Sequence, residues 1–492
     1  MQTIRSRRGL WWLSAIIAAG LATVGAVHLR SAGSAPLTRG GGTVDALRSS
    51  AAGASIIILV MDAARADHVG CYGYPRDTTP NLDRLAGSSV LFERHFSQSA
   101  ETKSSTACLL TSQYCDTNLA DGPRALIPGT FTLETGLRKA GFRTLLISSN
   151  LKASPLYGIG SDFQDSIWDR QLEVLAEKGE ERYAPTVALR AFRKWLADHP
   201  GERFFAYIHL APPHYPYGQP AEFTKRFAGL KPVSFQPGGL PFPESMPRPF
   251  PTPPRLPEWI NLYDANLRYS DWALGELVAL LRAQGVLDKT LLIVTADHGE
   301  AFGEHAHVWH GRSVHDEACH IPLVVRFPGG QLAGKRIPAL TESVDILPTL
   351  FDLLAARYPA EGVQGRSLLP LLADSRTSVS DYVFCRGGGK PSKYLVRSKD
   401  YALVLYSNGR WRALYDLKKD PGERTNVADA NRAVADSMAA AFAVFAQQQR
   451  RPPLDFLDPN AVMPPLPEVP EIQMSPEDRA RVKRIADLGY VR

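Results

Sequence analysis

Two short apolar segments that each end at an aspartate dominate the hydrophobic pattern of this chain. The first covers residues 55–61 and stops at Asp62, and the second covers residues 290–296 and stops at Asp297. An unbroken apolar segment of this length is typical of a strand that is buried on both faces, as in a parallel sheet. Open α/β sheets place their chemistry at the carboxyl edge of such strands. We therefore expect the two strands to bring Asp62, Asp297 and the adjacent His298 together.

Apolar strands and amphipathic helices alternate through most of the chain. Predicted strands cover residues 90–96, 142–148, 203–210 and 321–327, and predicted helices cover residues 132–140, 184–197, 262–287 and 342–355, the last interrupted by Pro348. This alternation predicts an α/β domain with a large, mainly parallel central sheet. Residues 394–406 and 410–417 alternate with a period of two and predict a smaller antiparallel sheet near the C-terminus.

The same patterns divide the chain into consecutive parts. We expect a membrane anchor or signal segment at residues 1–30, a flexible linker at 31–53, a catalytic domain at 54–375, a smaller C-terminal subdomain at 376–447, and a Pro-rich connector with a terminal helix at 448–492. A Pro-rich stretch without periodicity at about 231–257 predicts an insertion loop, either part of a lid or a surface excursion without a chemical role.

The N-terminal segment predicts export. Arg5, Arg7 and Arg8 precede an uncharged apolar stretch at residues 9–27, which is long enough to span a bilayer and also resembles a signal sequence. Positive residues before such a stretch keep the N-terminus in the cytoplasm. We therefore expect a single N-terminal anchor in the cell membrane, with the catalytic domain outside the cytoplasm. Cleavage followed by secretion or release into the periplasm is the alternative.

Composition and charge narrow the class of partner. The formal net charge is +6, and the positive residues beyond the first eight positions are scattered rather than clustered, so we expect no nucleic-acid partner. The five cysteines show no C-x-x-C spacing, which argues against a zinc cluster of cysteines. Cys108 and Cys115 can pair if the chain reaches an oxidising compartment.

Several motifs resemble those of the sulfatase family, within the alkaline phosphatase superfamily. The resemblance rests on residues 65–68, 70–73 and 79–83 in the opening signature, residues 297–300, 303–305 and 310–311 in a second metal segment, and residues 343–350 and 414–421 further on. It covers nearly all of residues 54–427. It implies an α/β sandwich with a large central sheet and a smaller C-terminal antiparallel sheet. It also implies one divalent metal ion, which would be Ca²⁺, Mn²⁺, Mg²⁺ or Zn²⁺.

The nucleophile position departs from the pattern of that family. In the family this position is a cysteine or serine that is oxidised to formylglycine, and aligned on residues 109–111 it is Thr102 here. Threonine cannot become formylglycine. Relatives with threonine at this position include phosphoglycerol and phosphoethanolamine transferases and nucleotide pyrophosphatase-like phosphodiesterases, which form a phospho-threonine. A second carboxylate that usually follows the first is replaced by Ala63.

The resemblance implies a metal site made of four side chains. Its ligands would be Asp62, Asp297, His298 and the hydroxyl of Thr102, and carboxylate with imidazole is a divalent-metal donor set. A threonine hydroxyl is a poor nucleophile at neutral pH unless its pKa is lowered, which a bound metal ion does.

Three further residues are catalytic candidates by their place in the motifs. His214 matches a family histidine that contacts the transferred group or protonates the leaving oxygen, and His310 matches a family position near the leaving group. Lys103, next to the nucleophile position, could bind an anionic oxygen. We expect Arg65 and Asp67 to form a salt bridge or a cap instead of taking part in catalysis.

The sequence therefore predicts a sulfatase-family metal-dependent ester hydrolase or transferase that acts on phosphoester or phosphodiester groups through a threonine nucleophile. A sulfuric ester hydrolase is an alternative that the family resemblance suggests. A catalytically degenerate member that keeps the fold as a binding protein is a third, because Ser104, Thr106 and Ser112 also depart from the nucleophile motif. In each case the expected partner is an anionic phosphate or sulfate ester.

Overall fold

The computed structural model describes residues 41–120, 125–178, 180–218, 220–230, 256–389, 392–407, 412–451 and 474–487. Its central sheet consists of β1 (Ser55–Met61), β2 (Val90–Phe96), β3 (Arg143–Ser148), β4 (Asp165–Trp168), β5 (Phe204–Leu210), β6 (Thr290–Thr295), β9 (His320–Arg326) and β10 (Lys335–Glu342). The strand order is β10-β2-β9-β6-β1-β5-β3-β4. Only β9 runs antiparallel to its neighbours β2 and β6. The predicted large and mainly parallel sheet is confirmed.

Strand β1 lies at the centre of this sheet, between β5 and β6, and both of its faces are buried. Ile56 and Ile58 pack into the apolar core on one face, and Ile57 and Leu59 pack into the core on the other. Side chains alternate between the two faces of a strand, so a strand covered on both sides needs apolar residues at every position. This is why every residue from Ile56 to Met61 is apolar and the polar Asp62 comes only at the edge of the sheet.

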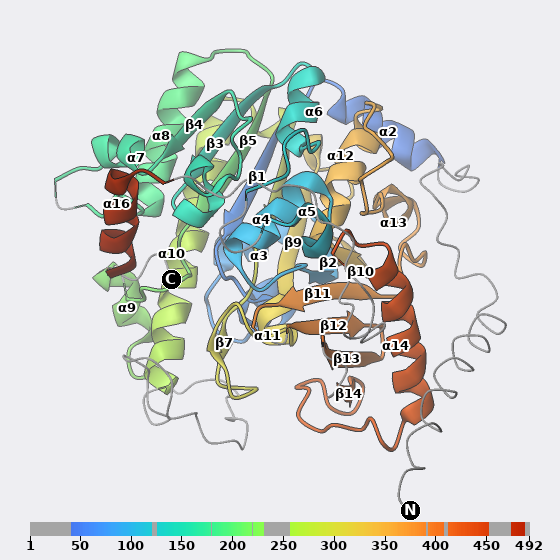
Figure 1. Cartoon of the computed structure of the whole chain (residues 1–492). Helices are drawn as coiled ribbons and strands as arrows, with labels where there is room; N and C mark the ends of the chain where they lie inside the picture. Colours follow the sequence, from blue (N-terminus) through green and yellow to red (C-terminus); the bar gives the residue numbers. More distant parts are fainter. Residues whose placement is uncertain are drawn as a thin grey trace, which may run out of the picture.

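Helices cover both faces of the central sheet (Figure 1). One core cluster draws most of its helical residues from α3 (Pro80–Ala86), α8 (Pro185–Asp198) and α10 (Leu256–Ala283). The opposite cluster draws them from α2 (Gly41–Ala51), α4 (Thr102–Thr111), α6 (Leu133–Lys139), α12 (Ile346–Leu353) and α13 (Leu369–Ala373). Shorter elements are α5 (Cys115–Asn118), α7 (Arg170–Leu175), α9 (Ala221–Phe227), α11 (Asp316–Cys319), α16 (Pro476–Asp487) and the two-stranded hairpin of β7 (Ala301–Phe302) and β8 (Val308–Trp309).

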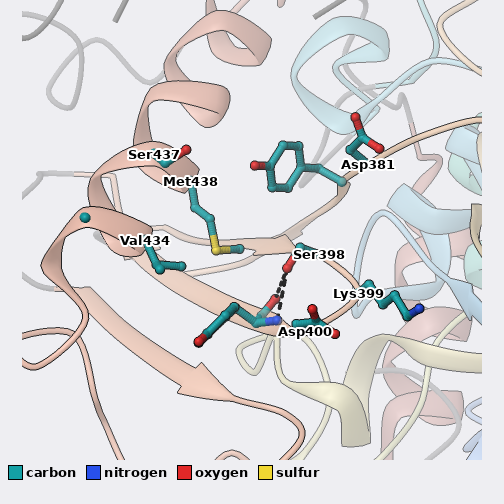
Figure 2. Close-up of a pocket in the computed structure, with 10 residues that line it drawn as sticks. Asp381, Ser398, Lys399, Asp400, Val434, Ser437 and Met438 are labelled. Carbon is teal, nitrogen blue, oxygen red and sulfur yellow. Dashed lines mark hydrogen bonds between the residues drawn. The ribbon is translucent and has the colours of Figure 1, made fainter. Parts of the chain in front are cut away.

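A smaller antiparallel sheet follows near the C-terminus, as predicted. It contains β11 (Val383–Gly387), β12 (Lys393–Arg397), β13 (Tyr401–Tyr406) and β14 (Arg412–Asp416), and α14 (Arg432–Gln447) packs against it (Figure 1). An open groove of about 460 Å³ lies between α14 and the turn that joins β12 to β13, lined by residues such as Ser398, Lys399 and Met438 (Figure 2). None of the residues that line it belongs to the motifs singled out in the sequence.

Two predictions about helices are wrong. Residues 41–51 form α2 and are not a flexible linker, since Val44, Leu47 and Ala51 share one helix face and are buried. The Gly- and Ser-rich composition of this stretch hides that apolar spacing. Pro348 does not interrupt its helix, because it occupies the first turn of α12, where a backbone N–H has no partner within the helix.

The predicted N-terminal anchor and most of the Pro-rich insertion at 231–257 lie outside the described residues. In the part of the chain that the structure describes, no helix combines the length and apolar character needed to cross a membrane.

Candidate active site

The two aspartates meet at the carboxyl edge of the sheet. Asp62 follows β1 and Asp297 follows β6, and these strands are parallel neighbours with Val60 opposite Thr295. His298 Nε2 lies 3.6 Å from Asp62 Oδ1 and 3.4 Å from Asp297 Oδ2. All three side chains are buried. The structure therefore brings together the three residues that the two apolar segments point to.

Thr102 lies in the same pocket. It is the first residue of α4, and its Oγ1 lies 3.1 Å from His298 Nε2. Its position at a helix N-terminus places unpaired backbone N–H groups and the positive end of the helix dipole beside the hydroxyl. Lys103 follows it in α4 and is also buried. This placement is suited to an anion that approaches the threonine hydroxyl.

The two candidate histidines surround this centre from other segments. His214 lies in the loop after β5, where its backbone N–H donates to the carbonyl oxygen of Asp62 at 3.0 Å. His310 follows β8, and its ring stacks on that of His298 with centroids 4.4 Å apart. The centroids of the His214 and His310 rings are 4.8 Å apart. Both histidines therefore belong to one cluster with the predicted metal ligands.

Three buried residues that the sequence analysis did not select also contact the site. His209 Nε2 lies 3.2 Å from Asp62 Oδ2 and 3.8 Å from Asp297 Oδ2. Asn150 Nδ2 donates to Asp62 Oδ2 at 2.5 Å. Glu300 Oε1 lies 2.9 Å from His310 Nδ1. The rule that identified Asp62 also applies to His209 and Asn150, because each sits where a neighbouring parallel strand ends.

Three buried atoms at the centre lack hydrogen-bond partners among the described residues. They are Asp62 Oδ1, Asp297 Oδ2 and His209 Nε2. One donor atom from each of these residues lies within 4.8 Å of the other two. Buried polar atoms without partners are costly, and converging carboxylate oxygens and ring nitrogens are satisfied by a divalent cation. The donor set therefore fits the divalent metal ion that the family resemblance implies.

The electrostatics of the pocket also favour a bound cation. Burial raises the pKa of Asp297, and the nearby charge of Asp62 raises it further. Burial also acts to raise the pKa of Asp62, but the imidazoles of His214, His209 and His298 outweigh it and hold that pKa far below its usual range. Two carboxylates this close repel each other, so a cation between them would stabilise the ionised form of both.

Arg65 connects the loop after β1 with the hairpin that precedes His310. Its guanidinium lies 2.7 Å from Asp67 Oδ2 and 2.6 Å from Glu304 Oε1, and it donates to the carbonyl oxygen of Glu300 at 2.9 Å. The predicted salt bridge with Asp67 is thus present. These contacts therefore join two segments of the site without involving the side chains of the predicted metal ligands.

Comparison with known families gives two matches. The family model described as sulfatase matches residues 54–356, which is more than half of the 492-residue chain. The family model described as N-sulphoglucosamine sulphohydrolase, C-terminal, matches residues 303–444. The second match includes β11 to β14 and α14.

Individual relatives are more distant. Arylsulfatase K of Rattus norvegicus is 33% identical over 182 residues, which cover 34% of this chain and 31% of that protein. The match thus spans about a third of the length of this relative. N-acetylglucosamine-6-O-sulfatase of Bacteroides thetaiotaomicron is 22% identical over 466 residues, covering 76% of this chain and 82% of that protein.

Solved structures share the fold. The phosphonate monoester hydrolase of Agrobacterium radiobacter superposes with a TM-score of 0.66 and 21% identity, over 80% of this chain and 95% of that chain. The matched architecture has the same large central sheet and small C-terminal sheet that the sequence predicted.

Proposed function

The chain belongs to the sulfatase family, and on that premise we propose that it is a metal-dependent hydrolase or transferase that cleaves phosphoester or phosphodiester bonds through Thr102. The observation that carries the proposal is the position of the Thr102 hydroxyl, 3.1 Å from His298 Nε2 in a pocket shared with Asp62 and Asp297. Threonine cannot provide the hydrated aldehyde on which formylglycine-dependent sulfatases rely. A hydroxyl in this position is instead suited to direct attack.

The proposed reaction assigns the Thr102 oxygen to the phosphorus atom. The Thr102 hydroxyl first loses its proton to solvent. As the new O–P bond forms, the bond from phosphorus to the leaving alcohol breaks, and the leaving oxygen takes a proton from His310 or His214, which recovers it from the water or acceptor hydroxyl of the second step. Water, or an acceptor hydroxyl in a transferase, then displaces the threonine. A divalent ion held by Asp62, Asp297 and His298 would lower the pKa of the attacking hydroxyl and offset the charge of the substrate.

His310 is held in a more defined orientation than His214, and burial with the nearby His298 holds its pKa well below its usual range. Its Nδ1 contacts the buried carboxylate of Glu300, whose other oxygen accepts a hydrogen bond from the Tyr217 hydroxyl at 2.8 Å. A carboxylate on one ring nitrogen fixes the orientation of an imidazole and leaves the other nitrogen for the substrate. His214 instead uses its Nδ1 toward the carbonyl oxygen of Tyr215 at 2.5 Å.

Hydrolysis of sulfate esters is a second candidate function. It is favoured by the names of the relatives, since both arylsulfatase K and N-acetylglucosamine-6-O-sulfatase are sulfatases. The phosphonate monoester hydrolase has the same fold. The same pocket would then have to transfer a sulfuryl group with an unmodified threonine.

We extend the proposal to the organisation of the whole chain. The catalytic domain would cover residues 54–375, followed by the subdomain at 376–447, and the apolar segment at residues 9–27 would hold it at the outer face of the cell membrane. Fractionation of cells into membrane and soluble material, followed by protease treatment from outside, tests this location.

The experiment that tests the function uses the purified full-length chain. Aryl phosphodiester, phosphomonoester and sulfate substrates are assayed with added divalent metal, and substrate-treated protein is analysed by mass spectrometry. We expect phosphoester turnover and a phosphate on Thr102 itself. Sulfate turnover without a phosphorylated threonine would favour the second candidate, and metal binding without any turnover would favour a binding protein.

A further inference from the structure

The second carboxylate of the family pattern is missing here, and its position is occupied by Ala63. The backbone N–H of Ala63 donates to Asp297 Oδ1 at 3.0 Å, so this position supplies a backbone hydrogen bond but no ligand. Without a replacement, the site would have one negative charge and one donor atom fewer. The neighbouring strand provides a different donor that faces the same two aspartates.

That donor is His209, on strand β5. In the register of the sheet, His209 lies directly opposite Val60, two residues before Asp62. Its side chain is fully buried, and its Nε2 has no hydrogen-bond partner among the described residues. The other ring nitrogen, Nδ1, lies 3.4 Å from the hydroxyl of Tyr207. The ring thus presents one nitrogen toward the two aspartates.

Most of the separations between donor atoms are close to those around a single small cation, and the distance from His209 to Asp297 is longer. His209 Nε2 lies 3.2 Å and 3.8 Å from Asp62 Oδ2 and Asp297 Oδ2. His298 Nε2 lies 3.4 Å from Asp297 Oδ2 and 3.1 Å from the Thr102 oxygen. For donors about 2.1 Å from one Zn²⁺ ion, neighbouring donors are about 3.0 Å apart in an octahedron and about 3.4 Å apart in a tetrahedron.

A second histidine cluster shows that proximity alone does not make such a site. His305, His315 and Glu317 also lie close together, but the two imidazole rings are stacked with centroids 3.6 Å apart and planes at 4°. The lone pair of a ring nitrogen lies in the plane of its ring, so two parallel stacked rings cannot direct their lone pairs at one ion. Both nitrogens of His305 also have partners, Glu317 Oε1 at 3.0 Å and the carbonyl oxygen of Glu423 at 2.9 Å.

We propose that His209 is a metal ligand through Nε2, in place of the missing carboxylate, and that it makes the site selective for Zn²⁺ over Ca²⁺. Ca²⁺ takes six to eight oxygen ligands, whereas imidazole nitrogen suits Zn²⁺ and its transition-metal neighbours. With His298, the site then offers two imidazoles and only two carboxylates. The inference rests on the proposed function for its choice of site, but it concerns metal binding and not turnover.

The test measures metal affinity in the absence of substrate. The full-length chain is stripped with a chelator and titrated with Zn²⁺ or Ca²⁺ against a chromophoric chelator, for the wild type, His209→Gln, His209→Asn and the control His199→Gln. His199 is a partly exposed histidine at the end of α8. The absorption of bound Co²⁺ is recorded in parallel, because it changes when an imidazole ligand is lost.

We expect the wild type and His199→Gln to bind Zn²⁺ far more tightly than Ca²⁺. In the His209 variants, Zn²⁺ affinity should fall by about 10- to 100-fold or more, with a changed Co²⁺ spectrum and little change for Ca²⁺. An unchanged ratio of Zn²⁺ to Ca²⁺ affinity, or a Ca²⁺ preference in the wild type, would overturn the inference. Zn²⁺ selectivity lost in the variants without any phosphoester turnover in the wild type would refute only the proposed function.

Discussion

The hydroxyl of Thr102 lies 3.1 Å from the Nε2 atom of His298, although the two residues are 196 positions apart in the chain. The first begins α4 and the second follows the end of β6. Helix N-termini favour negative charge, and the carboxyl edge of a parallel sheet is where ligands bind. The two features face each other here, so one small volume combines a hydroxyl, an imidazole and a preference for anions.

Removal of the hydroxyl tests this arrangement directly. Thr102→Ala should lower phosphoester kcat by about 10³-fold or more, because it removes the hydroxyl that we propose forms the covalent intermediate. Thr102→Ser keeps the hydroxyl and should retain part of the activity. The exposed Thr377→Ala serves as the matched control. Steady-state kinetics measures all three, and near-wild-type turnover of Thr102→Ala would exclude a threonine nucleophile.

Glu300 should act on the reaction through His310. Glu300→Gln removes the carboxylate that contacts His310 Nδ1 and should lower kcat by about 10- to 100-fold with little change in KM. The limb of the kcat–pH profile that reports His310 should also shift to lower pH, because loss of the neighbouring negative charge lowers the pKa of the imidazole. The exposed Glu361→Gln is the control. If Glu300→Gln loses as much kcat with a substrate whose leaving group needs no protonation as with one that does, the role of Glu300 is purely structural.

Gly299 should not tolerate a side chain. A Cβ atom there would lie 2.1 Å from the carbonyl oxygen of Glu317 and 3.0 Å from its carbonyl carbon, and backbone atoms cannot move aside easily. We expect Gly299→Ala to lower the free energy of unfolding by about 3 kcal/mol. The control Gly53→Ala has open space around it and should change stability by less than about 0.5 kcal/mol. Urea denaturation without added metal measures both.

Metal binding should stabilise the fold through the paired aspartates. At a concentration 100 times its dissociation constant, a divalent ion adds about 2.7 kcal/mol to the free energy of unfolding. Asp297→Asn should not be stabilised by added metal. In the presence of a chelator, the variant should be more stable than the wild type, because the substitution removes the repulsion between the carboxylates of residue 297 and Asp62. Thermal denaturation with and without metal checks both signs. A metal-induced rise in Tm that survives in the variant would place the ion elsewhere.

Stability should fall with rising pH because of a buried acidic pair beneath α4. Burial, together with the charge of Asp345, raises the pKa of Glu342 to about 8, and burial raises that of Asp345 to about 6. The folded state therefore prefers both acids protonated, so the contribution of this pair to stability is fully present near pH 4 and is lost as pH rises through 8. Glu342→Gln should show a shallower decline in urea midpoints between pH 5 and 8.5. A curve parallel to that of the wild type, and to the exposed control Glu222→Gln, would contradict this.

The parts of the fold that the sequence predicted are those with strong local patterns. Apolar strands that end at Asp62 and Asp297 show both their burial and their direction, so the sheet and the central residues of the site could be inferred. His209 also lies near the end of an apolar strand, but a single histidine there is usually structural, so the strand pattern alone does not distinguish it from a core residue. Only the pairing of β5 with β1 shows which atoms it faces.

Two further features depend on packing that no local pattern shows. The face of α2 formed by Val44 and Leu47 is hidden among Gly, Ala and Ser residues and becomes apparent only against α12 and α13. The contact of Glu300 with His310 depends on the hairpin of β7 and β8, which returns the chain over ten residues. Both are tertiary effects on segments with weak intrinsic preferences.

The C-terminal sheet contacts the segment that leads into α4. The backbone N–H of Arg386, on β11, donates to the carbonyl oxygen of Gln98 at 2.9 Å, and Arg386 also forms a parallel bridge with Ser99. Three residues later the chain reaches Thr102. The small sheet therefore supports the segment that positions the proposed nucleophile, and we expect a chain shortened to end before β11 to keep the proposed metal ligands together while Thr102 moves away from His298.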